Sequence, residues 1–65
     1  MIKTVVRFPN DMVMVFDEKG EQIPKYQGPY EEVRDEILRD ASPDAIFGQT
    51  INSRGETHLK MREKW

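Results

Sequence analysis

The side chains best suited to chemistry in this chain are basic and lie near its C-terminal end. On an extended strand, alternate residues share one face about 6–7 Å apart, which is close to the phosphate spacing of a nucleic-acid strand. His58, Lys60, Arg62 and Lys64 alternate in this way. An aromatic side chain at the end of such a row can stack on a base. The predicted nucleic-acid contact consists of Arg54, His58, Lys60, Arg62, Lys64 and Trp65.

The charge distribution leaves other interpretations of this basic segment open. Residues 1–50 hold six Lys/Arg against ten Asp/Glu, a balance of −4, whereas residues 51–65 hold four against two, a balance of +2. Glu56 and Glu63 interrupt the positive charge. Basic residues on an edge strand also prevent pairing with another sheet. The segment is therefore interpreted as edge protection, as a site for nucleic acid or another anion, or as a contact for a protein partner.

The remaining polar residues form no catalytic or metal-binding pattern. His58 is the only histidine and the chain has no cysteine, so a thiolate metal site is impossible. A catalytic histidine needs a nucleophile or an orienting carboxylate beside it, and Ser53 and Glu56 are near only in sequence. The helical carboxylates Glu31, Glu32, Asp35, Glu36 and Asp40 lie opposite the apolar stripe and are interpreted as a solvated face. We expect no enzymatic activity and no cofactor.

The elements that must position these residues are organised around the apolar run Met12–Phe16. Five consecutive apolar residues between turn-forming segments are typical of a central strand that is covered on both faces. Further strands are predicted at residues 2–8, 21–23, 45–51 and 57–62. The loops Asp17–Glu21 and Asn52–Glu56 each place a glycine where a left-handed residue closes a hairpin.

One helix is predicted from Pro29 to Ala41. Proline suits the first helical position, and Tyr30, Val33, Ile37, Leu38 and Ala41 form one apolar stripe. Pro43 places the helix end nearby, because the residue before a proline is pushed out of the α region.

The predicted fold is α+β: a small antiparallel sheet, in the order β-β-(β)-α-β-β, with one helix packed on one face. Residues 1–65 form a single domain, and 63–65 are expected to fray. The other sheet face carries Val5, Val13 and Val15, which predict a surface for a protein partner or a second copy. Whether 52–65 form a hairpin or a flexible tail stays open at this point.

These observations predict a non-enzymatic interaction module that uses an uncovered sheet face or an edge strand. Nucleic-acid binding through the basic C-terminal strand is the alternative. No segment approaches the roughly 20 apolar residues that span a bilayer, and the N-terminal residues do not resemble a secretory signal. We expect a cytoplasmic protein. The sequence identifies neither the partner, nor the biological process, nor the oligomeric state.

Overall fold

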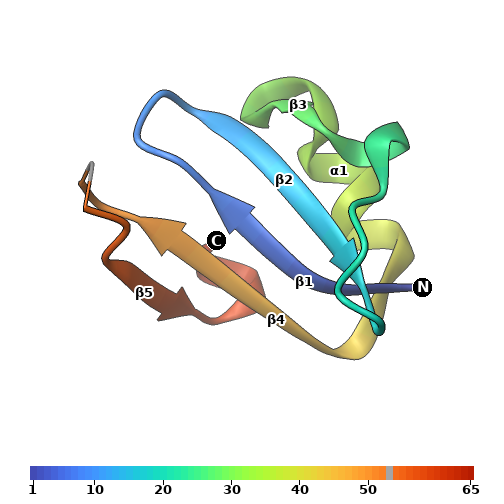
Figure 1. Ribbon diagram of the computed structural model, residues 1–65. Coiled ribbons are helices and arrows are strands. Elements are labelled where there is room, and N and C mark those ends of the chain that lie inside the picture. Colours follow the sequence, from blue (N-terminus) through green and yellow to red (C-terminus); the bar gives the residue numbers. More distant parts are fainter. Residues whose placement is uncertain (53) are drawn as a thin grey trace.

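The computed structural model describes residues 1–52 and 54–65 and shows one helix against a five-stranded mixed sheet (Figure 1). The sheet order is β3-β2-β1-β4-β5. Two short 3-10 turns complete the fold: η1 lies between β2 and β3, and η2 follows β5. In chain order the elements are β1 (Ile2–Arg7), β2 (Met12–Asp17), η1 (Pro24–Tyr26), β3 (Gly28–Pro29), α1 (Tyr30–Asp40), β4 (Ala41–Thr50), β5 (Thr57–Lys60) and η2 (Arg62–Lys64).

The α+β class and the single helix are confirmed, whereas the prediction of a fully antiparallel sheet is wrong. α1 has Pro29 and Ala41 as its caps, so the predicted boundaries hold to within one residue. β1 pairs with β4 in parallel, and the other three strand pairs are antiparallel. The reason is the crossover: a helix between two strands carries the chain back across the sheet, so that β4 runs in the direction of β1.

The predicted third strand at residues 21–23 is also misplaced. Gln22 forms only one isolated bridge, to Phe16, and the strand that borders β2 is Gly28–Pro29. Pro24 ends the extended segment and begins η1, as expected of a residue that cannot donate to a strand ladder.

The two glycine loops share one backbone design. The backbone N–H groups of Lys19 and Glu21 donate to Oδ1 of Asp17, and Gly20 has φ +82°. In the second loop the N–H groups of Arg54 and Glu56 donate to Oδ1 of Asn52, and Gly55 has φ +84°. Both loops confirm the predicted left-handed glycine.

The core lies between the sheet and α1, and it contains the three valines that were assigned to the uncovered face. Val5 and Val15 are fully buried and Val13 is 1% exposed. That face assignment is therefore wrong. An irregularity between Ile2 and Thr4 shifts the register of β1 against both neighbours. This shift places Ile2 and Val5 on one side, and a one-residue shift exchanges the two faces of a strand.

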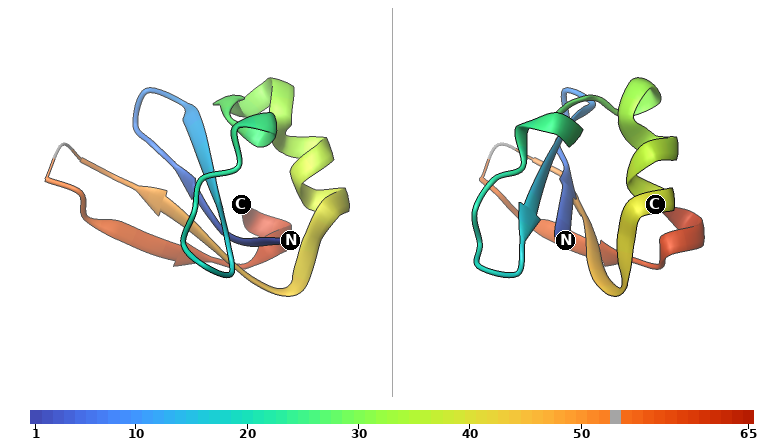
Figure 2. Two further views of the ribbon diagram at one scale, coloured as in Figure 1. Left: turned by 45° about the vertical axis from the view of Figure 1, so that its right-hand side comes forward. Right: turned by 90° about the vertical axis from the view of Figure 1, so that its right-hand side faces the viewer.

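The C-terminal residues complete the same core instead of fraying. Trp65 is 4% exposed, its ring lies 5.1 Å from those of Tyr30 and Phe47, and its indole N–H donates to the carbonyl of Gly48 at 3.1 Å. Figure 2 shows η2 and α1 on the same side of the sheet. Residues 57–60 pair with β4 as a hairpin, so the second half of the chain is built into the fold.

Candidate interaction surface

The sheet face opposite α1 has no layer of this chain packed across it in the described residues. Because side chains alternate along a strand, the neighbours of buried Val5, Val15 and Phe47 point to this side. The strand registers join them into rows, for example Val6 with Met14 and with Gly48. We call this surface the open face; its strand residues are Thr4, Val6, Met12, Met14, Phe16, Ile46, Gly48, Thr50, Thr57 and Leu59, and Phe8, directly after β1, continues the alternation.

None of these eleven residues is charged. An antiparallel sheet with one face in water usually alternates between apolar residues inside and polar residues outside. Here Leu59 is 74% exposed and Ile46 47% exposed, while Val6, Met14 and Phe16 are half-buried among their neighbours. The only polar groups on the open face are threonine hydroxyls, and those of Thr50 and Thr57 bond each other at 3.1 Å.

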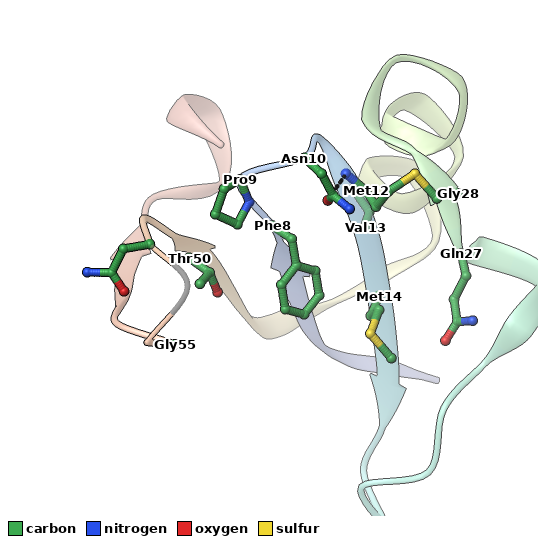
Figure 3. A pocket seen from close by; sticks show the side chains of 11 residues that line it. Phe8, Pro9, Asn10, Met12, Val13, Met14, Gln27, Gly28, Thr50 and Gly55 are labelled. Carbon is green, nitrogen blue, oxygen red and sulfur yellow. Dashed lines mark hydrogen bonds between the residues drawn. The ribbon is translucent and has the colours of Figure 1, made fainter.

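One end of the open face is hollowed out where the β1–β2 turn, the β4–β5 loop and β3 come near one another. The hollow has a volume of about 660 Å³. Figure 3 shows the ring of Phe8 and the side chain of Met14 within it, with Gln27 on the β3 side. Its lining residues are Phe8, Pro9, Asn10, Met12, Val13, Met14, Gln27, Gly28, Thr50, Asn52 and Gly55.

Gln27, one of the residues that line the hollow, carries an unusual polar atom. Its Oε1 is buried and has no hydrogen-bond partner among the described residues. Buried polar groups in folded proteins are nearly always paired, so an exception requires an explanation. Sequence reasoning missed both the hollow and the unpaired oxygen of Gln27, because the hollow is formed by segments that are distant along the chain.

The predicted basic row is not formed by the described residues. β5 ends at Lys60, and the chain then turns into η2. The guanidinium of Arg62 donates to the carbonyls of Leu38, at 3.4 Å, and of Ser42. Arg62 therefore binds the C-terminal end of α1, where carbonyls lack helical partners.

Trp65 is buried in the core and is not available to stack on a base. Arg54, His58, Lys60 and Lys64 are exposed, and nucleic-acid binding through them stays a prediction. Ser53, which was considered as a neighbour of His58, lies outside the described residues.

The helical carboxylates differ from one another in their surroundings. Glu31, Glu32, Asp35 and Glu36 are exposed. Asp40 accepts hydrogen bonds from Arg39 at 3.0 Å and from the Tyr26 hydroxyl at 2.7 Å. The hydrogen bonds from Arg39 and Tyr26 lower the pKa of Asp40 to about 2, and the same contact raises the pKa of Tyr26. This cluster ties the end of α1 to η1 and lies apart from the hollow.

Comparisons with known proteins add no function to this geometry. No protein-family model matches the chain, and searches of curated proteins and of solved structures find no significant similarity. Among the described residues, no helix has the length and apolar character needed to cross a membrane. The fold and the surface define a small α+β domain with a mixed sheet and one face left open.

Proposed function

We propose that this protein is a non-enzymatic interaction module that binds a protein partner, or a second copy of itself, through the open face. The observation that carries the proposal is the apolar character of β2 on both sides. Val13 and Val15 pack under α1, whereas Met12, Met14 and Phe16 point to the open face. β2 therefore has the apolar composition of a strand that is covered on both of its faces. In the described residues of this chain, only the face under α1 is covered.

The size of the open face suits such a role. The open face occupies one broad side of a molecule that measures 27 × 24 × 21 Å, which corresponds to a flat area of at most about 650 Å². A surface of about 800 Å² on each partner is typical of specific protein complexes. Contiguous apolar surface of several hundred Å² marks interaction sites on soluble domains.

The open face is a better candidate than the edge of β5. All four residues of β5 are exposed, and Lys60 lies on this edge strand. A lysine on an edge strand opposes pairing with another strand. The hollow, for its part, has no ionisable lining residue, and the hydroxyl of Thr50 is already bonded to Thr57. These features favour binding over catalysis.

The test compares two isoleucines of nearly equal exposure, one within β4 and one directly after its end, where continued alternation places its side chain on the opposite side of the sheet. Ile46, on the open face, is 47% exposed, and Ile51, one residue beyond Thr50 in the alternation, is 46% exposed. Peptides are selected on the wild-type protein from a random displayed library, and their affinities are measured by fluorescence anisotropy. We expect Ile46→Lys to weaken binding by about tenfold or more, which is about 1.4 kcal/mol, and Ile51→Lys to leave it unchanged.

Sedimentation equilibrium at high protein concentration tests the second-copy form of the proposal. A dimer that Ile46→Lys dissociates and Ile51→Lys preserves supports self-association through the open face. The proposal is wrong if the selected peptides bind both lysine variants as tightly as the wild type and no dimer forms. It is also wrong if the peptides perturb only amides of α1 or of the exposed basic residues in NMR spectra.

A further inference from the structure

The hollow at the end of the open face is lined in part by Gln27, whose Oε1 is covered and unpaired in the part of the chain that the structure describes. Its volume of about 660 Å³ lies within the roughly 300–1,000 Å³ of pockets that hold organic ligands. A hollow of this size can admit an aromatic side chain together with part of the segment that carries it. Its walls are mainly the side chains of Phe8, Met12 and Met14 and the backbone of Gly28.

The polar atom specifies the chemistry of the group that completes the hollow. Oε1 of Gln27 is an acceptor, so a group that satisfies it must carry an N–H or O–H donor. The oxygen is covered in the free protein, and in Figure 3 the carboxamide extends on the Met14 side of the hollow. Methionine side chains are unbranched and flexible, so Met12 and Met14 can move aside for an entering ring.

An apolar ring that ends in a single donor describes the side chains of tyrosine and tryptophan. These residues also supply many of the strongest contacts at protein interfaces, because they combine a large apolar area with a polar tip. We propose that the hollow is an anchor pocket for a tyrosine or tryptophan side chain of a partner protein, whose O–H or N–H donates to Gln27 Oε1. This inference rests on the proposed function of the open face.

The anchor must come from a different protein, because this chain has no such side chain to offer in the fold described. The Tyr26 hydroxyl donates to Asp40 at 2.7 Å and the Tyr30 hydroxyl donates to the carbonyl of Trp65 at 2.5 Å. The indole N–H of Trp65 donates to Gly48. A second copy would have to break one of these internal hydrogen bonds to provide the anchor, so the inference commits to a heterologous partner.

The test uses two soluble probes that differ by one hydroxyl, N-acetyl-tyrosinamide and N-acetyl-phenylalaninamide. Each is titrated into the ¹⁵N-labelled protein and followed by amide NMR. We expect the tyrosine probe to bind about five- to tenfold more tightly and to shift amides around the hollow, those of Gly28, Thr50 and Gly55 among them.

Gln27→Met keeps the length of the side chain and removes the acceptor. In this variant we expect the two probes to bind equally, whereas Gln22→Met, an exposed glutamine outside the hollow, should preserve the difference. A second readout needs no ligand: Gln27→Met removes an unpaired buried polar atom, so its thermal unfolding midpoint should rise above that of the wild type.

The inference is overturned if the wild type does not distinguish the two probes, or if the preference for tyrosine survives in Gln27→Met. It is equally overturned if both probes shift amides only outside the hollow. None of these results affects how selected peptides discriminate between Ile46→Lys and Ile51→Lys. The anchor-pocket proposal can therefore fail while the proposal for the open face still holds.

Discussion

At the scale of single residues, Gly48 joins the two sides of the sheet. Its carbonyl accepts the indole N–H of Trp65, which belongs to the core. Its Cα faces the open side, where an added Cβ would lie 2.8 Å from Cγ2 of Thr57. The close neighbour of such a Cβ is therefore a side chain of β5.

We expect Gly48→Ala to lower the free energy of unfolding by about 1 kcal/mol. To make room, Thr57 must rotate, and rotation breaks its hydrogen bond with Thr50, a contact of that magnitude. Urea denaturation measures the loss. The same substitution in a Thr57→Ser background should be neutral or slightly stabilising, because serine lacks the crowding methyl group and alanine restricts the unfolded chain. Equal losses in the two backgrounds would contradict this explanation.

At the scale of elements, the end of α1 is held by side chains from both neighbouring segments. Tyr26 of η1 donates to Asp40, and Arg62 of η2 donates to the carbonyls of Leu38 and Ser42. A carboxylate at a helix C-terminus is unfavourable with respect to the helix dipole. Asp40 is tolerated there because Arg39 and Tyr26 both donate to it.

The lowered pKa of Asp40 predicts a loss of stability in acid. Its pKa is about 2 in the fold against an ordinary value of 3.8, so folding favours the charged form. The stabilisation is complete above about pH 4 and is lost as the pH falls to about 2. Thermal unfolding of wild type and Asp40→Asn should therefore differ most above pH 4 and converge towards pH 2.

Tyr26→Phe is the companion variant, because it removes one of the two donors that lower the pKa of Asp40. We expect its acid-induced loss to begin at the same pH as in the wild type, to be complete at a higher pH, and to be smaller, because only the pKa of Asp40 in the folded state changes. Parallel curves for wild type and Asp40→Asn throughout this range would show that Asp40 does not stabilise the fold through its charge.

The helix and the loops could be predicted from the sequence, whereas the strand pairing and the buried sheet face could not. The helix and both glycine loops depend on neighbours within a few residues, so local patterns predicted them. The pairing of β1 with β4 depends on a crossover, and the sheet face depends on the irregularity near Lys3, which no local pattern marks. Because Val13 and Val15 alternate with Met12, Met14 and Phe16, both faces of β2 are apolar and composition alone could not select the buried one.

The sequence predicted that one sheet face would be an apolar interaction surface, but it did not predict which residues form that face. Met12–Phe16 is a strand with two apolar faces, and this is the property on which the proposed function depends. It is not the central strand covered on both faces that the sequence predicted, because β1 is the middle strand of the sheet and the described residues cover only one face of β2. The residues Val5, Val13 and Val15 were assigned to the wrong side, since the register shift exchanged the faces. The unpaired oxygen of Gln27 could not be predicted, because it is a property of the tertiary structure.

At the scale of the whole molecule, the core is closed by a segment that the sequence suggested would fray. Trp65 packs against Tyr30 of α1 and Phe47 of β4 and thereby links the helix to the sheet. A 65-residue domain has about 3–10 kcal/mol of stability in all. Removing a buried tryptophan side chain typically costs about 3–5 kcal/mol, which is a large share of that total.

We therefore expect Trp65→Ala to unfold much of the protein at 25 °C, seen as collapse of amide dispersion in NMR and loss of the cooperative urea transition. Trp65→Phe keeps a ring in place but loses the hydrogen bond to Gly48, so it should remain folded and lose about 1 kcal/mol. Lys64→Ala, at an exposed neighbour, should be neutral. If Trp65→Ala unfolded at the wild-type urea concentration, the segment after β5 would be an appendage, and the core would consist of the sheet and α1 alone.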